Sequence, residues 1–423
     1  MKEPYFSKNK IDTQLYNFGI HLFSIVLRIL SVFDPKIRKG VAGRKATFNV
    51  LESNLNASQK NIWFHCASLG EYEQGLPVFE KIRSLYPEHH IVLSFFSPSG
   101  YEIRKHTEVA DTVVYLPIDT KSNAKRFVDI VQPTLTVFVK YDIWSNLLLY
   151  LNKCNLPSIL ISAAFREKQI FFKPFGKKQR DALMTFDHIF VQNDDSKQLL
   201  NSIGYEDVTV SGDTRYDRVS NQLDQDNNID FISEFKGNST CVVIGSSWPE
   251  DEAILIPFIN KHASKDMKFI IAPHEIKAGH INDIISKLNV NHILFSTKTG
   301  QELSAYDVFI IDTIGLLSKI YSYADVAYVG GAMGTTGLHN ILEPAVFGCP
   351  ILIGKNYKKF PEAQQMINNA GVISVQNKSD LEHHLSELIT SKGLRKSLGL
   401  KNTSFIESNK GAVDSIIKYL DVK

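Results

Sequence analysis

Residues 328–354, with the sequence YVGGAMGTTGLHNILEPAVFGCPILIG, indicate the fold of this chain. An apolar run at residues 327–329 ends in Gly330 and Gly331, residues 340–347 have helical character, and residues 350–353 begin another strand. A strand, a glycine loop, a helix and a strand in succession are typical of an α/β fold. A glycine loop that enters a helix offers backbone N–H groups and a helix dipole to a phosphate. The alternative is a tight turn whose glycines serve only packing.

Polar side chains interrupt the apolar character of this stretch where the expected helix begins. Glu343 lies about one helical turn beyond His339 and Asn340, on the same face. A carboxylate in that place can accept hydrogen bonds from both hydroxyls of a ribose. The pattern therefore favours a nucleotide site over a purely structural turn.

Length and composition limit the number of domains, the class of partner and the cellular compartment. A chain of 423 residues is too long for one hydrophobic core, so we expect two domains. The net charge of +2 gives no general attraction to nucleic acid, and we expect no nucleic-acid partner. The four cysteines (Cys66, Cys154, Cys241 and Cys349) are far apart and lie in or beside apolar runs. We expect them to be buried thiols in a reducing compartment.

The segment from Leu15 to Phe33 is strongly apolar, but its polar residues recur every three or four positions. They form one narrow helical stripe: Gln14, Asn17, His21, Ser24, Arg28 and Ser31. The charge and the stripe argue against a membrane-spanning helix, and the segment lacks the features of a signal peptide. We predict an amphipathic helix in the membrane surface, followed by basic residues that suit anionic headgroups: Lys36, Arg38, Lys39, Arg44 and Lys45. The alternative is a helix packed on the protein's own core.

From residue 61 onward, apolar strands alternate with helical segments. The strands expected in the first half are residues 62–66, 91–96, 113–116, 135–139, 158–162, 188–192 and 208–211. Those expected in the second half are residues 241–244, 269–272, 292–295, 308–311, 326–329, 351–353 and 372–375. This alternation predicts two doubly wound, Rossmann-like domains with parallel sheets, whose strand ends face a shared cleft.

The expected division of the chain follows from these patterns. It consists of a membrane-associating segment at residues 1–45, a first Rossmann-like domain at 46–219, a linker at 220–237, a second Rossmann-like domain at 238–379, and C-terminal helices at 380–423. We expect the C-terminal helices to return towards the first domain.

Several polar residues follow buried strands of the first half. Glu71, in the turn Ser68-Leu69-Gly70-Glu71, can act as a general base on a hydroxyl, or it can be an ordinary carboxylate favoured by the helix dipole. The cations Lys140, Arg166 and Arg215 also follow apolar strands and suggest an anionic ligand. A solvated lysine is the alternative for Lys140.

Further candidates in the second half lie where a doubly wound domain binds a nucleotide. They are Ser246, Ser247, Pro273, His274, Ile314, Gly315 and Leu316. Small hydroxyls and backbone amides suit phosphate oxygens, and exposed backbone suits the edge of a base. We expect neither a metal nor a cofactor, because the one Asp-x-Asp motif lies in the expected linker, and the motifs of P-loop enzymes and serine hydrolases are absent.

Taken in order, these motifs resemble the 3-deoxy-D-manno-octulosonic acid (Kdo) transferases of lipopolysaccharide synthesis, which have the GT-B glycosyltransferase fold. The resemblance covers nearly the whole chain. It includes the apolar N-terminal helix, the Ser68–Glu71 turn, Trp144 with Asn146, residues 211–217, residues 245–247, and Gly330-Gly331 leading to the sequence HNILEP at residues 339–344.

The resemblance implies a metal-independent transferase that moves Kdo from CMP-Kdo to a lipid A precursor at the cytoplasmic face of the inner membrane. It implies that Glu71 is the general base and that Arg215 stabilises the transition state. The positions that would hold CMP are Pro273, His274, Ile314, Gly315, Leu316, Asn340, Ile341, Leu342 and Glu343.

Three positions depart from the family pattern. Lys140 replaces a glutamate that acts as a second stabiliser in the family, and the nearby Asp142 can assume part of that role. The usual Pro-Arg-His reads Pro273-His274-Glu275, and the usual Trp-Pro-Asn reads Trp144-Ser145-Asn146. A GT-B transferase or epimerase that uses a UDP-sugar is one alternative. A non-catalytic scaffold at the membrane is another, but it predicts the loss of Glu71, Asn340 and Glu343, which are present.

Overall fold

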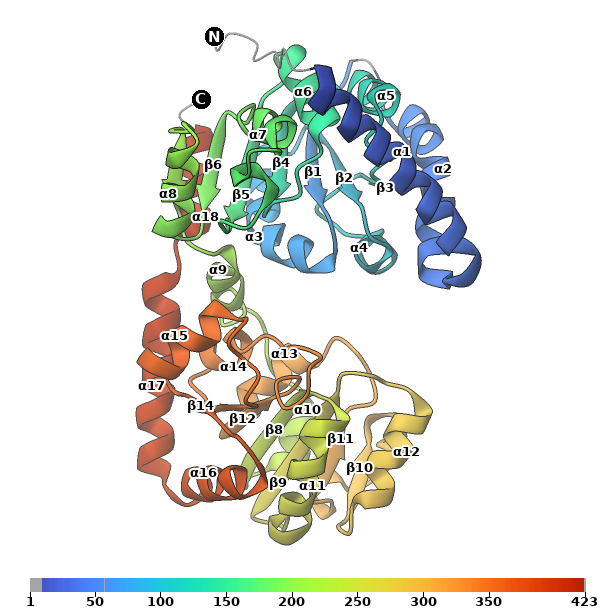
Figure 1. Cartoon of the computed structure of the whole chain (residues 1–423). Helices are drawn as coiled ribbons and strands as arrows, with labels where there is room; N and C mark the ends of the chain where they lie inside the picture. Colours follow the sequence, from blue (N-terminus) through green and yellow to red (C-terminus); the bar gives the residue numbers. More distant parts are fainter. Residues whose placement is uncertain (1–9, 57, 422–423) are drawn as a thin grey trace. The chain divides into compact units, whose positions relative to one another are not determined.

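The protein consists of two α/β units, each built on one parallel sheet (Figure 1). The structure is a computed structural model that describes residues 10–56 and 58–421. The first unit comprises residues 1–218 and 410–423, and the second comprises residues 219–409. Residues 1–9 of the expected N-terminal segment and residues 422–423 of the expected C-terminal helices lie outside the described residues.

The first sheet has seven parallel strands in the order β3-β2-β1-β4-β5-β6-β7. In chain order they are β1 (Asn61–Cys66), β2 (His90–Phe95), β3 (Thr112–Tyr115), β4 (Pro133–Val139), β5 (Ser158–Ala163), β6 (His188–Val191) and β7 (Val208–Val210). The direction of winding reverses between the neighbouring strands β1 and β4. In open α/β sheets, ligands bind beyond the carboxyl ends of the strands at such a reversal.

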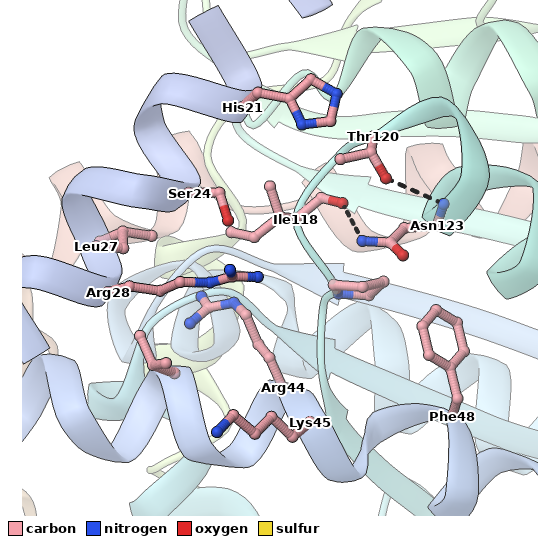
Figure 2. Close-up of a pocket in the computed structure, with 12 residues that line it drawn as sticks. His21, Ser24, Leu27, Arg28, Arg44, Lys45, Phe48, Ile118, Thr120 and Asn123 are labelled. Carbon is pink, nitrogen blue, oxygen red and sulfur yellow. Dashed lines mark hydrogen bonds between the residues drawn. The ribbon is translucent and has the colours of Figure 1, made fainter.

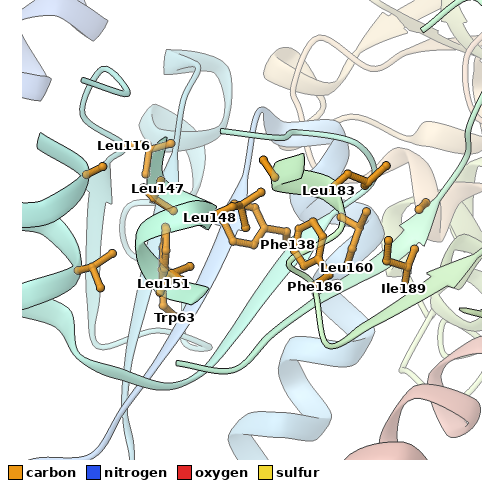
Figure 3. Close-up of a cluster of buried hydrophobic side chains, with 14 of the residues drawn as sticks. Trp63, Leu116, Phe138, Leu147, Leu148, Leu151, Leu160, Leu183, Phe186 and Ile189 are labelled. Carbon is orange, nitrogen blue, oxygen red and sulfur yellow. The ribbon is translucent and has the colours of Figure 1, made fainter. Parts of the chain in front are cut away.

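Helices cover both faces of this sheet. They are α3 (Leu69–Leu85), α4 (Pro98–Arg104), α5 (Lys121–Val131), α6 (Ser145–Lys153), α7 (Lys177–Leu183) and α8 (Asp194–Ser202), with a 3-10 turn at Ile170–Phe172. A further helix, α9 (Thr214–Ser220), follows β7. Because side chains alternate along a strand, Trp63 of β1 enters the core under α5, α6 and α7 (Figure 3), whereas Phe64 enters the core under α3. Both side chains are fully buried.

Two helices precede the first strand and contact each other: α1 (Lys10–Phe33) and α2 (Pro35–Asn54). Asp34 caps α2 by accepting hydrogen bonds from the amides of Lys36 and Ile37. Gly43 lets α2 approach β3, since a Cβ at this position would lie 2.3 Å from the Tyr115 ring.

Helix α1 turns most of its apolar side chains away from the protein. It is long and apolar enough to cross a membrane, and only 6% of its most apolar window is buried. Phe18 is 67% exposed and Phe33 is 80% exposed. Two of its polar residues face inward instead, where Tyr16 bonds to Asp119 and Asn17 to Asn146. The apolar helix is confirmed, and its apolar face is not part of the protein's own core.

The second unit repeats the design with the strand order β10-β11-β9-β8-β12-β13-β14, all parallel. The strands are β8 (Thr240–Ser247), β9 (Met267–Pro273), β10 (His292–Leu294), β11 (Val308–Ile310), β12 (Val326–Val329), β13 (Ile351–Ile353) and β14 (Val372–Ser374). The winding here reverses between β8 and β12. The glycine loop of residues 330–337 therefore follows a strand at the reversal.

The helices of the second unit are α10 (Asp230–Lys236), α11 (Pro249–His262), α12 (Ala278–Lys287), α13 (Leu317–Ile320), α14 (Leu342–Val346), α15 (Pro361–Asn369), α16 (Lys378–Thr390) and α17 (Lys392–Asn409). Short 3-10 turns lie at Phe295–Thr297, Leu303–Ala305 and Tyr321–Tyr323. Helix α10 lies within the stretch interpreted as a linker and buries Ile232 and Phe235. The last helix, α18 (Ala412–Asp421), belongs to the first unit and packs on α3.

The expected α/β architecture is confirmed, and a strand is present near each of the fourteen expected positions. Two details were wrong. Cys154 is exposed rather than buried because it follows the end of α6, whereas Cys66, Cys241 and Cys349 are buried. The helix expected at residues 340–347 is only the five-residue α14, because Asn340 forms a turn that precedes it.

Candidate active site

Glu71 lies beyond the carboxyl end of β1, where the strand order reverses. Strand β1 ends at Cys66, and Glu71 falls in the first turn of α3, whose N-cap residue is Ser68. The Ser68 hydroxyl donates a hydrogen bond to Oε2 of Glu71. The carboxylate side chain is 16% exposed, so it is oriented by the protein and still accessible.

Lys140 follows the neighbouring strand β4 and faces the same carboxylate. Its Nζ lies 3.9 Å from Oε1 of Glu71. Its backbone has φ = +73°, the left-handed region that non-glycine residues rarely occupy. Strained backbone of this kind clusters at functional sites. The structure thus brings together the expected base and one of the three expected cations.

Asp142 is already committed to other partners. Its Oδ2 accepts hydrogen bonds from Nε2 of His65, at 2.7 Å, and from the indole of Trp144, at 3.0 Å. Nδ1 of the same ring forms a hydrogen bond with the Ser94 hydroxyl 2.8 Å away. This buried chain was missed in the sequence, although a histidine inside an apolar strand was a signal for it.

Arg215 is held by a buried carboxylate from the same turn. Asp213 accepts from Nε of Arg215 at 2.9 Å and from its terminal nitrogen at 2.7 Å. Gln74 of α3 donates to the other oxygen of Asp213 at 2.8 Å. These bonds connect Arg215 to the helix that carries Glu71. By contrast, Arg166 is exposed and forms no ion pair in the part of the chain that the structure describes.

In the second unit, the glycine loop is fixed by a carboxylate that the sequence did not reveal. Asp251 of α11 is fully buried and accepts hydrogen bonds from the amide of Gly331, at 2.8 Å, and from the hydroxyl of Tyr328. Burial raises the pKa of Asp251. Asp251 thus takes up the Gly331 amide, which is one of the backbone N–H groups of the glycine loop. A Cβ at Gly330 would lie 2.4 Å from the carbonyl oxygen of Ser246, so close packing requires that glycine.

Three aromatic side chains gather beside this loop. The ring of His274 stacks on Trp248 with centroids 4.6 Å apart, and it lies 4.4 Å from the ring of His339. The Trp248 indole donates to Nε2 of His339 at 3.2 Å. Burial, together with the neighbouring His274, lowers the pKa of His339 to about 4, and burial also lowers the pKa of His274. Both imidazoles are therefore neutral at pH 7. Trp248 was not among the residues predicted from the sequence.

The polar pair expected for a ribose lies next to this cluster. Nδ2 of Asn340 donates to Oε1 of Glu343 at 3.1 Å. The side chains of Ile341 and Leu342 are buried in the core, which leaves only their backbone for a ligand. Pro273 is also buried, at the end of β9.

The two remaining expected groups differ in accessibility. Ile314 is 81% exposed on the loop after β11, and Gly315 follows it with φ = +92°. Ser246 has φ = +53°, whereas the hydroxyl of Ser247 is buried and donates to Glu252 at 2.8 Å. Exposed backbone beside an apolar side chain suits the edge and face of a base.

One group of possible metal ligands lies elsewhere. In the described residues, His383, His384 and Glu387 of α16 are the histidine and carboxylate side chains close enough to share an ion. None of these three residues belongs to the sites described above. Those sites offer side chains and backbone amides that suit organic ligands and phosphate groups.

The curated proteins similar to this chain include several with the same described activity. The family model described as 3-deoxy-D-manno-octulosonic-acid transferase (kdotransferase) matches residues 42–218. The 3-deoxy-D-manno-octulosonic acid transferase of Haemophilus influenzae is 28% identical over 412 residues, which cover 93% of each chain. That of Chlamydophila psittaci is 26% identical over 424 residues, which cover 96% of this chain and 95% of that protein.

A solved structure supports the architecture alone. UDP-GlcNAc 2-epimerase from Neisseria meningitidis, bound to UDP-GlcNAc, matches with a TM-score of 0.62 and 14% identity. The match covers 86% of this chain and all of that one. The two parallel seven-stranded units thus have the GT-B type of architecture that was expected.

Proposed function

This chain belongs to the Kdo transferase family, and from that membership we propose that it moves Kdo from CMP-Kdo to a hydroxyl of a lipid A precursor. The similarity to curated Kdo transferases along nearly the full length of both chains is the observation that carries the proposal. The accessible carboxylate of Glu71, at the reversal of a doubly wound sheet, supports a hydroxyl acceptor.

In the proposed reaction, Glu71 takes the proton from the acceptor hydroxyl. The hydroxyl oxygen then forms a bond to the anomeric carbon of Kdo, while the bond from that carbon to the phosphate oxygen of CMP breaks. The bonding electrons leave with the phosphate, and the transition state has oxocarbenium character. The Ser68 hydroxyl orients Glu71 for this transfer.

Cations of the first unit stabilise the charge that develops on the leaving phosphate. Arg215 is the principal candidate, because Asp213 and Gln74 fix its position before the reaction begins. Lys140 is the second candidate, since its ammonium group already lies beside Glu71. Asp142 is a positioning group in this proposal, because His65 and Trp144 use its Oδ2.

The second unit binds the cytidine monophosphate part of the donor. Asn340 and Glu343 bind the ribose, and the exposed backbone of residues 314–316 binds the edge of the base. Because His274 and His339 are neutral at pH 7, they contribute hydrogen bonds and ring contacts rather than positive charge. Neutral donors therefore replace the arginine that other family members carry at the position of His274.

The exposed apolar face of α1 places the enzyme on the membrane that holds its acceptor. Most of its apolar side chains face outward, while Tyr16 and Asn17 bond to the first unit, so the helix lies in the membrane surface rather than across it. We propose the cytoplasmic face of the inner membrane, where a lipid A precursor and a soluble nucleotide-sugar meet.

Transfer can be tested with the detergent-solubilised protein, CMP-Kdo generated in the assay, and a tetraacylated lipid A precursor. We expect a mass gain of one or more Kdo units on the lipid. Glu71→Gln should lower the rate by about 10²- to 10⁴-fold and leave CMP binding unchanged, and the exposed Glu88→Gln is the matched control. Loss of CMP binding in Glu71→Gln would contradict the role of Glu71. Binding of a UDP-sugar, without CMP binding or Kdo transfer, would overturn the proposed function.

A further inference from the structure

A pocket of about 450 Å³ lies in the first unit between α1, α2 and the loop that leads from β3 to α5 (Figure 2). One part of its lining is apolar: Leu27, Val41, Phe48, Pro117 and Ile118. The other part is polar: His21, Ser24, Arg28, Arg44, Lys45, Thr120 and Asn123. We call it the α1–α2 pocket. It belongs to neither of the sites described above.

The charged groups of this pocket have one sign. Its lining contains Arg28, Arg44 and Lys45, and no aspartate or glutamate occurs among the described residues that form it. Arg28 and Lys45 form no ion pair with the described part of the chain. Figure 2 shows the guanidinium groups of Arg28 and Arg44 directed into the same space. Like charges in one pocket repel each other, so an anion between them is favoured.

Arg44 is fixed in place without a carboxylate. Its Nε donates to the carbonyl of Leu116 at 3.1 Å, a terminal nitrogen donates to the carbonyl of Phe96, and the guanidinium lies 4.2 Å from the Phe96 ring centroid. Burial lowers the pKa of Arg44 to about 10, so it stays protonated at pH 7. The nearest acidic residue of the loop, Asp119, bonds instead to Tyr16 and to the first amides of α6.

The pocket opens beside the face that we assign to the membrane. His21, Ser24 and Arg28 belong to the polar stripe of α1, whose remaining surface is apolar and exposed. A ligand that combines a phosphate with apolar groups, and that is held at the membrane surface, matches both parts of the lining. Arg44, which is held in place, together with Arg28 and Lys45 suits the oxygens of one phosphate.

We propose that the α1–α2 pocket binds the phosphate group of a membrane lipid. This inference rests on the proposed contact of α1 with the membrane, but it does not depend on the transferase activity. It differs from general attraction between basic residues and an anionic surface, which involves no particular site.

The test compares two pairs of substitutions that remove equal charge. Arg28→Gln with Lys45→Gln removes two cations from the pocket. Lys36→Gln with Lys39→Gln removes two from the exposed surface of α2, outside the pocket. Binding of the full-length proteins to phosphatidylcholine vesicles is measured by co-sedimentation, with either phosphatidate or phosphatidylglycerol added. Salt at about 0.5 M screens general surface attraction.

At high salt we expect the pocket pair to weaken binding about tenfold or more, because charge-assisted hydrogen bonds to phosphate are lost. We expect the surface pair to bind like the unchanged protein, and Lys45→Arg to retain binding. A preference for phosphatidate would identify a phosphomonoester, as a glycolipid acceptor can carry, and equal binding would identify phosphate in general. Circular dichroism of the pocket pair verifies its folding.

Two results would overturn the inference. If both pairs of substitutions weakened vesicle binding equally, at low and at high salt, the basic residues would act through general attraction to the membrane surface and not through a binding site. If inorganic phosphate, at the same concentration as the lipid phosphate, displaced the protein from the vesicles, the pocket would be a site for free phosphate and not for a lipid.

Discussion

Lys140 combines a strained backbone with a charge beside the proposed base. A left-handed conformation costs a non-glycine residue about 1 kcal/mol, and glycine avoids this cost. We therefore predict that Lys140→Gly is more stable than Lys140→Ala by about 1 kcal/mol, measured by chemical unfolding. Both variants lose the ammonium group 3.9 Å from Glu71, so the transfer rate of both should fall at least about tenfold.

The two variants serve as controls for each other, because both lack the ammonium group and they differ by one methyl group and in backbone freedom. If the transfer rate stays unchanged in both, Lys140 is a strand-end lysine without a part in the reaction. If Lys140→Gly is no more stable than Lys140→Ala, the backbone at this position carries no strain.

His339 makes the stability of the second unit depend on pH. Its pKa is about 4 in the folded protein, below the ordinary value of 6.5. Between these values the unfolded chain binds more protons, so the free energy of unfolding falls as the pH is lowered from 6.5 to 4. The predicted loss is up to about 3 kcal/mol.

Chemical unfolding of the unchanged protein and of His339→Gln, at pH 7 and at about pH 4.5, measures this contribution. Glutamine can still accept the hydrogen bond of Trp248 but does not titrate in this range. We expect the variant to lose less stability at the lower pH. The same pH dependence in both proteins would show that His339 is not held in its neutral form.

The positions of Glu71, Lys140 and Arg215 were predictable, because each lies within a few residues of the end of an apolar strand and parallel strands end at one edge of a sheet. The partners that fix the sites were not predictable. Asp251 lies 80 residues before the Gly331 amide that it binds, and His65 lies 77 residues before Asp142. Such bonds depend on the final packing of helices, about which local sequence patterns contain no information.

At the scale of elements, α1 is attached to the first unit through a buried polar network. Asp119 accepts hydrogen bonds from the Tyr16 hydroxyl, at 2.7 Å, and from the amides of Asn146 and Leu147. The Lys178 ammonium lies 4.4 Å from the Tyr16 ring centroid and donates to Asn146. Burial raises the pKa of Asp119 to about 6. The polar stripe predicted an amphipathic helix, but periodicity alone could not show which face contacts the protein.

Tyr16→Phe should loosen α1, because it keeps the ring under Lys178 and removes one donor from a buried carboxylate. The expected cost is about 1–3 kcal/mol. Hydrogen exchange of the α1 amides in detergent should become faster, while exchange in the sheet stays unchanged. Ser31→Ala is the control, since the Ser31 hydroxyl bonds only within α1. Unchanged exchange in Tyr16→Phe would mean that apolar contacts alone hold the helix.

At the scale of the whole molecule, each unit has its own buried side chains. The first sheet has one hydrophobic cluster on each face, and the second unit has a separate cluster. The fourteen strands were predictable because parallel strands buried on both faces are continuous apolar runs. The place where the chain leaves the second unit was not predictable, because α16, α17 and α18 are consecutive helices and their local patterns do not show on which unit each one packs. The assignment of α18 to the first unit depends on which surface its apolar face fits.

Ile416 tests this division of the chain into two units. It is fully buried on α18, in the core that α3 and the first sheet share, although it follows the whole second unit in the sequence. Ile416→Ala should destabilise the first unit by about 2–5 kcal/mol, because it leaves a cavity in that core. Calorimetry should show the transition of the first unit at a lower temperature and that of the second unit unchanged. Lys418→Ala, on the exposed face of the same helix, should leave both transitions in place. A shift of the second transition, or one transition that moves as a whole, would show that the two units do not unfold independently.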